Sequence, residues 1–130
     1  MFNVRLDLAS GVPVYRQIID QVTTGIATRS LKPGDQLPTV RQLAVDLAIN
    51  PNTVVRAYRE LEIRGVLETQ QGTGTFISSK RIKPDEAEDE RRLDQIVADA
   101  VARAGAAGFT VKDILDRLNA LQALVKRKGN

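Results

Sequence analysis

Four polar side chains suited to reading base pairs recur at helical spacing in the middle of the chain. Placed about 100° apart around a helix, Asn52, Arg56 and Arg59 share an arc of about 60°, and Thr53 lies beside it. Asparagine can pair with adenine and arginine with guanine through two hydrogen bonds each, and threonine can bond a phosphate or touch a thymine methyl group. These types at this spacing indicate a helix that enters the major groove of DNA.

The opposite face of the same segment is apolar and predicts a buried side. It consists of Val54, Ala57, Tyr58 and Leu61. Tyr58 could stack on a base, but its place on this face favours a core position. Because any surface helix is polar on its outer side, the polar arc alone does not decide the function, and the neighbouring elements must be considered.

Local signals place this helix in a recurring layout. Asn50 and Pro51 are typical of a helix start, and Gly65 of a left-handed helix end. A preceding short helix is expected to begin at the capping box of Thr39 and Gln42 and to end near residue 48, which leaves a very short link. An amphipathic helix is expected over 13–29, an extended arm or strand over 3–8, and strands over 66–70 and 75–78 around a turn at 71–74. We therefore predict a mainly α fold with a small β-hairpin wing, that is, a winged helix-turn-helix.

Several segments together resemble the GntR family of bacterial repressors, and in particular its YtrA-like branch. They are Pro13–Ile18, Leu37–Ala44, Asn50–Leu61, Arg64–Leu67 and Gly72–Ile77. The resemblance covers about residues 10–79. It implies that Arg41 contacts the DNA backbone or a guanine, and that Asn50, Asn52 and Thr53 read DNA. It also implies that Gly72, at the wing tip, lets the wing approach the minor groove. The predicted DNA-binding residues are Thr39, Arg41, Asn50, Asn52, Thr53, Arg56, Arg59, Gly72, Thr73 and Gly74.

The chain departs from the family pattern at three places. Many relatives carry Ser-Arg where this chain has Asn50-Pro51. Many also carry arginine in place of Val55, and Arg56, one position along, is a candidate to supply the missing charge. Relatives often have glycine at Ala48, and alanine there costs little provided that the position is not left-handed. Base preference is therefore not transferred from the family.

The C-terminal third is expected to form two amphipathic helices, broken at residues 105–108. Neither helix can bury its apolar stripe alone, and the resemblance implies that this tail joins two chains into a homodimer. Packing within one chain is the alternative. The predicted dimerisation residues are Leu93, Ile96, Val97, Ile114, Leu118, Leu121, Leu124 and Val125. The acidic run at 85–90 suits a solvated helix start better than a metal site.

Composition limits the function classes. The chain has no cysteine and no histidine, so we expect no metal site, no cofactor and no enzymatic activity. Neither a signal peptide nor a membrane span is evident, and a cytoplasmic location is expected. Residues 1–83 hold eleven Lys and Arg against seven Asp and Glu, whereas residues 84–130 hold eight against nine. The basic surplus therefore lies in the N-terminal two-thirds of the chain.

These expectations give a domain plan: a DNA-binding domain over 1–80, a connector over 81–84 and a helical dimerisation region over 85–130. Double-stranded DNA and a second copy of the chain are the expected partners, and no residue pattern names a small-molecule effector. A winged-helix adaptor for another protein is the competing hypothesis. A phosphate-binding loop at Gly72–Gly74 is disfavoured, because no Gly-Lys-Ser/Thr follows and the loop opens into a strand.

Overall fold

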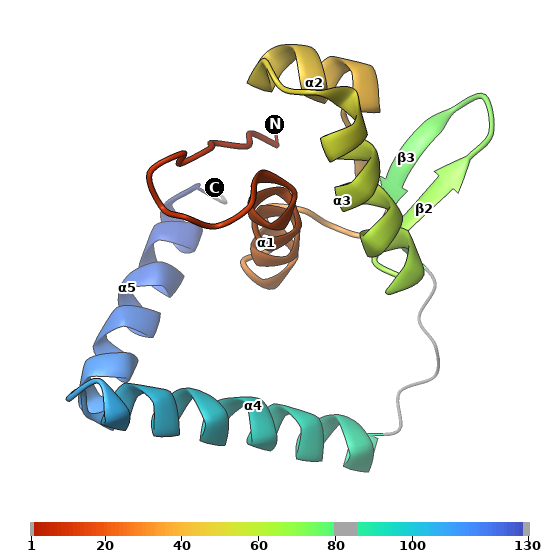
Figure 1. The fold of residues 1–130 in the computed structure, drawn as a ribbon. Coiled ribbons are helices and arrows are strands. Elements are labelled where there is room, and N and C mark those ends of the chain that lie inside the picture. Colours follow the sequence, from red (N-terminus) through yellow and green to blue (C-terminus); the bar gives the residue numbers. More distant parts are fainter. Residues whose placement is uncertain (1, 80–85, 129–130) are drawn as a thin grey trace. The chain divides into compact units, whose positions relative to one another are not determined.

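The computed structural model describes residues 2–79 and 86–128. The chain divides into two compact units, Met1–Ser79 and Lys80–Asn130, and each is described by itself. The connector predicted over 81–84 lies outside the described residues. Within the described part, five helices and a small antiparallel sheet confirm a mainly helical fold with a wing (Figure 1).

The first unit begins with three helices whose ends follow the local signals. They are α1 (Val14–Ala27), α2 (Val40–Leu47) and α3 (Pro51–Ile63). Both hydrogen bonds of the capping box at Thr39 are present, with Gln42 N to Thr39 Oγ1 at 3.1 Å and Thr39 N to Gln42 Oε1 at 3.0 Å. Asn50 caps α3, because its side-chain oxygen accepts from Asn52 N at 2.8 Å. Gly65, just after α3, is left-handed with φ +78°, as expected.

The link between α2 and α3 contains a strained residue. Ala48 has φ 54° and ψ 47°, which is the left-handed region. The left-handed conformation costs a residue with a Cβ roughly 1–2 kcal/mol. The condition under which alanine would be harmless here is therefore not met, and Ala48 carries a conformational cost that glycine would avoid.

The wing belongs to a three-stranded sheet rather than to a hairpin alone. Its strands are β1 (Gln36–Leu37), β2 (Leu67–Gln70) and β3 (Gly74–Ile77), in the order β1-β3-β2, all antiparallel. The sequence did not predict β1, because two residues show no alternation and their partners lie about forty positions away. In Figure 1 the β2–β3 hairpin projects beside α3.

The core of this unit lies among α1, α2, α3 and the base of the sheet. The largest fully buried side chains are Ile18, Ile19 and Val22 of α1 and Val54 and Leu61 of α3. The apolar face predicted for α3 is buried as expected. Burying such side chains stabilises a fold by about 1.5–3 kcal/mol each, so the packing of α1 on α3 fixes how α3 presents its other face.

The N-terminal arm is extended but forms no strand in the described residues. Two glutamines one turn apart on α1 bond the backbone of the arm, as a neighbouring strand would do in a sheet. Gln21 accepts from Arg5 N at 2.9 Å and donates to Arg5 O, and Gln17 accepts from Asp7 N at 2.8 Å and donates to Asp7 O at 3.0 Å. Val4, which directly precedes Arg5, is buried in the core.

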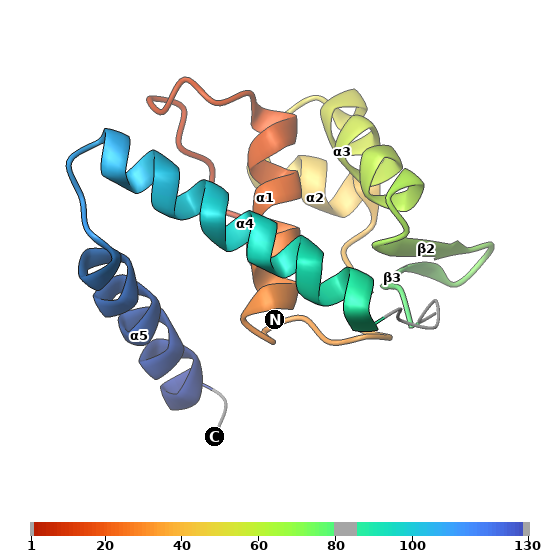
Figure 2. The ribbon, with the colours of Figure 1, turned by 90° about the horizontal axis from the view of Figure 1, so that it is seen from below.

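The second unit consists of α4 (Glu86–Ala106) and α5 (Val111–Lys128). Thr110 and Asp113 exchange hydrogen bonds at the start of α5. The two helices diverge from the turn that joins them (Figures 1 and 2), and most of their large apolar side chains stay exposed. The exposed ones are Leu93, Ile96, Val97, Val101, Phe109, Val111, Leu115, Leu118, Leu121 and Leu124.

Candidate DNA-binding surface

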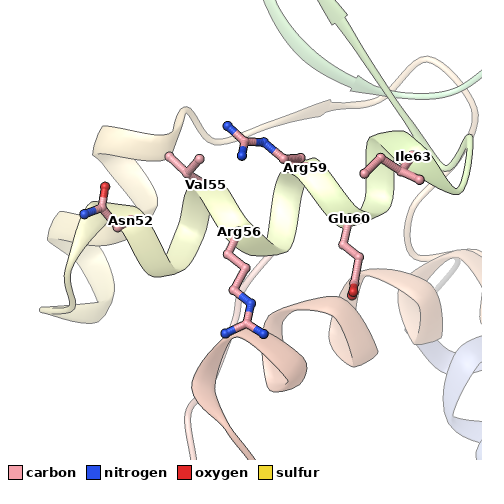
Figure 3. A pocket seen from close by; sticks show the side chains of 6 residues that line it. All are labelled: Asn52, Val55, Arg56, Arg59, Glu60 and Ile63. Atoms are coloured by element: carbon pink, nitrogen blue, oxygen red, sulfur yellow. The ribbon is translucent and has the colours of Figure 1, made fainter.

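The outer face of α3 carries a row of side chains with free hydrogen-bonding groups. Asn52 and Arg59 are exposed, as predicted, and Val55 lies between them on the same side of the helix (Figure 3). Within the described residues, the side chains of Asn52 and Arg59 make no hydrogen bond and no ion pair. Their carboxamide and guanidinium groups are therefore available to an external partner.

Arg56 is exposed but lies on a second row that faces α1. Its guanidinium carbon sits 3.8 Å from the ring centroid of Tyr15, which is cation–π geometry. Figure 3 shows Arg56 and Glu60 pointing toward α1, away from Val55 and Arg59. In this arrangement Arg56 does not stand in for an arginine at position 55.

Glu60, the other charged residue on the row that faces α1, forms an ion pair. Glu60 lies 3.6 Å from Arg64 in an exposed ion pair one turn along the helix. Such pairs contribute little to stability, but this one neutralises the carboxylate nearest the reading face. Because this pair carries no net charge, the Glu60 carboxylate does not cancel the positive charge of Arg59.

Tyr58 anchors α3 from its buried side. Its hydroxyl donates to the Pro38 carbonyl at 2.8 Å, and its ring is buried, so the core position favoured by its apolar surroundings is confirmed. Desolvation by burial raises the pKa of Tyr58 above its usual range. The phenol therefore stays protonated and keeps donating, which holds α3 at a fixed distance from the residues before α2.

The start of α2 presents a further cation. Arg41 is exposed in the first turn and makes no hydrogen bond or ion pair in the described part of the chain. Thr39, at the same helix end, uses its oxygen lone pairs in the capping box, which leaves its hydroxyl proton for another acceptor. Both groups suit a phosphate, to which the free N–H groups of a helix start also point.

The wing tip is built on two left-handed glycines. Gly72 has φ +83° with open space around the place of a Cβ, so its conformation, not crowding, requires glycine. Gly74 has φ +131°, and a Cβ there would lie 2.6 Å from Gln36 Nε2. Gln36 in turn donates to Thr73 O at 3.1 Å, which ties the wing turn to β1.

Sequence reasoning missed the apolar members of this surface. Asn52, Val55, Arg56, Arg59, Glu60 and Ile63 together line a shallow hollow of about 460 Å³. Val55 and Ile63 carry no chemistry by residue type, and Ile63 is 78% exposed. The signal that could have found them was their spacing of three and four residues from Asn52 and Arg59.

Comparison with known proteins decides what kind of molecule this is. Residues 14–77 match the family of bacterial regulatory proteins of the gntR type. The chain is 37% identical over 107 residues to the uncharacterized regulator YhcF of Bacillus subtilis, covering 82% of this chain and 88% of that protein. The chain belongs to the GntR family.

Other GntR-family relatives agree with this assignment. The repressor YtrA of Bacillus subtilis is 48% identical over 75 residues, 58% of each chain. YtrA of Sulfolobus acidocaldarius matches in structure with a TM-score of 0.59 at 35% identity, over 76% of this chain and 97% of that one. The DNA-binding domain of AraR, solved with an operator, matches 60% of this chain and 93% of that one with a TM-score of 0.50 at 26% identity.

The GntR match starts at α1 and ends at β3, so it covers the helices and the sheet of the first unit. Proteins of this family are transcriptional regulators that bind DNA, and so is this chain; it is not an enzyme. In the described residues no helix is long and apolar enough to cross a membrane, and no group of three acidic side chains could hold a metal ion.

Proposed function

We propose that this GntR-family regulator binds a palindromic operator as a homodimer and represses transcription in the cytoplasm. Each α3 would lie in the major groove and each wing in the minor groove, with Arg41 and Thr39 on the backbone. A two-fold dimer and an inverted repeat share the same symmetry, so that two reading helices address grooves about one helical turn apart, ~34 Å.

One observation carries the DNA-binding part of this proposal. The face of α3 that the core leaves outside holds Asn52 and Arg59 with all their polar atoms free. A protein-binding adaptor face would instead be expected to present apolar side chains with few free charges at its centre. Unpaired amide and guanidinium groups suit base edges better, because those edges offer the matching donors and acceptors.

Exposed apolar stripes support the homodimer. Ile96 on α4 is 64% exposed and Leu118 on α5 is 55% exposed, among the ten large apolar side chains of this unit that are exposed. Contiguous apolar surface of this kind marks an interface, since leaving it in water is costly. Of the predicted dimerisation residues, Ile114 is half-buried and the side chain of Val125 lies outside the described ones. The tail is therefore assigned to dimerisation, beyond a DNA-binding head over residues 1–80.

The test measures DNA binding by single-residue variants. Fluorescence anisotropy gives the affinity of each variant for a duplex selected from a random library. We expect Arg59→Ala and Asn52→Ala to weaken binding about tenfold to a hundredfold, because each removes one bidentate base contact. Arg64→Ala is the matched control: it removes the same charge from the far end of the same helix and should have a small effect.

Salt provides the second readout of the same experiment. The affinity of the wild-type protein should fall steeply as salt rises, because binding releases counterions from the phosphates. A wild-type protein that selects no duplex at low salt would refute DNA reading by α3. Equal losses in Arg59→Ala and Arg64→Ala would show that only net charge matters.

A further inference from the structure

Val55 is an apolar residue within the otherwise polar outer face of α3. Along α3 it lies three positions after Asn52 and four before Arg59, and Figure 3 shows the three side chains on one side of the helix. It is half-buried and lines the shallow hollow described above. An apolar group in this place can contribute no hydrogen bond to a base.

Val55 does not serve the core either. The buried cluster takes Val54, Ala57, Tyr58 and Leu61 from α3, and Val55 is absent from the partly buried side chains packed against that cluster in residues 2–79. Its partial burial therefore comes from its neighbours on the outer face. Two methyl groups are left facing outward between an amide and a guanidinium.

Arg56 does not supply the polar group that Val55 lacks. Arg56, the next residue, stacks on Tyr15 at 3.8 Å and points toward α1. A cytosine opposite Val55 would have to leave its amino group without an acceptor, which costs free energy once water is excluded. Thymine instead offers an apolar group in the major groove, its C5 methyl.

We propose that Val55 selects thymine by packing on its C5 methyl group, between the bases contacted by Asn52 and Arg59. This inference rests on the proposed placement of α3 in the major groove. It names a third reading residue in each half-site, one that acts by apolar contact. The half-site then combines two polar contacts with one methyl contact.

The experiment removes the methyl group from the DNA without changing base pairing. A duplex is selected from a random library with the wild-type protein, and each thymine is replaced in turn by deoxyuridine, in both half-sites together. We expect one symmetry-related pair of replacements to weaken binding about four- to sixteenfold, since each of the two buried methyl groups contributes a factor of up to about four.

Variants assign the effect to the side chain. In Val55→Ala the same deoxyuridine replacement should have no more than a slight effect, because the partner methyls are gone. Ile63→Ala, which shortens another apolar residue of the same hollow, is the matched control and should retain the full effect. Far-ultraviolet circular dichroism checks that both variants are folded.

The outcomes separate this inference from the function on which it rests. A selected duplex whose thymines all tolerate replacement, or an effect that persists in Val55→Ala and vanishes in Ile63→Ala, overturns the role of Val55 alone. A wild-type protein that selects no duplex overturns the proposed function and this inference with it.

Discussion

At the scale of single residues, two positions determine how the helix-turn-helix is held. Ala48 closes the link between α2 and α3 in the left-handed region, and Tyr58 joins α3 to Pro38. Ala48 adds a conformational cost within the link. Tyr58 contributes a hydrogen bond that persists because burial keeps its hydroxyl protonated. Both can be measured in the free energy of unfolding without any DNA.

Replacing Ala48 by glycine should stabilise the protein. Glycine reaches φ 54° without a Cβ clash, although it loses more backbone entropy on folding, so we expect a gain of up to about 1 kcal/mol in the free energy of unfolding. Urea unfolding followed by circular dichroism measures it. Ala27→Gly, at the last residue of α1, is the control and should lose about 0.5–1 kcal/mol. A loss in Ala48→Gly would contradict the strain.

Alkaline pH should destabilise the fold through Tyr58. Because burial raises the pKa of Tyr58, the folded state keeps its proton after the unfolded chain has begun to lose it near pH 10. The stabilisation of the fold by protonated Tyr58 is therefore intact below that pH. As the pH rises further, the free energy of unfolding falls by up to about 1.4 kcal/mol per pH unit.

Tyr58→Phe isolates this contribution. The variant should lose about 1 kcal/mol at neutral pH with the hydrogen bond to Pro38, and its unfolding free energy should fall less steeply above pH 10 than that of the wild type. Curves that stay parallel from pH 9 to 11 would show that Tyr58 does not titrate differently in the two states.

At the scale of elements, local interactions were predictable and contacts between distant segments were not. The caps at Thr39 and Asn50 involve atoms within three residues, so residue types suffice to find them. Strand β1 exists only because β3 pairs with it, and Arg56 turns toward α1 only because Tyr15 packs there. The sequence therefore predicted α3 and its polar outer face, but not which of its arginines makes no hydrogen bond, ion pair or ring contact within the described residues.

The helices α4 and α5 provide the element-scale test of the dimer. Ile96→Glu places a carboxylate in the exposed apolar stripe of α4, and a buried unpaired charge costs several kcal/mol. We expect the dimer dissociation constant to rise at least about a hundredfold. Sedimentation equilibrium measures it.

The control for this experiment lies on the same helix. Ala102 falls about 180° around α4 from Leu93, near the middle of the side away from the apolar stripe, so Ala102→Glu adds the same charge without entering the proposed interface. It should remain a dimer. Identical sedimentation of Ile96→Glu and the wild type would place the interface elsewhere.

At the scale of the whole molecule, the two units differ in the forces they offer. The first unit carries the unpaired polar side chains on the outer face of α3, whereas the helices of the second unit expose mainly apolar stripes. The proposed contacts to DNA and the proposed association between copies thus fall in different parts of one chain. Binding to an inverted repeat would use both at once.

Spacing between half-sites tests this joint use. Inserting five base pairs at the centre of the selected operator turns one half-site to the opposite face of the duplex, so the two heads can no longer bind together. We expect a loss of affinity of about a hundredfold or more. Inserting five base pairs just outside the operator leaves the spacing of the half-sites unchanged and serves as the control. Unchanged affinity after the five-base-pair insertion would argue for independent monomers.

The bond from Tyr58 to Pro38 closes a loop of structure that runs through α2, the link at Ala48 and α3. Because this hydrogen bond joins the two ends of the loop, it resists bending at the link, and α2 and α3 should move together as one rigid body. A signal that weakens operator binding would then act by changing the separation or tilt of two intact heads. Mutations that lock the protein in one regulatory state should accordingly cluster outside this loop.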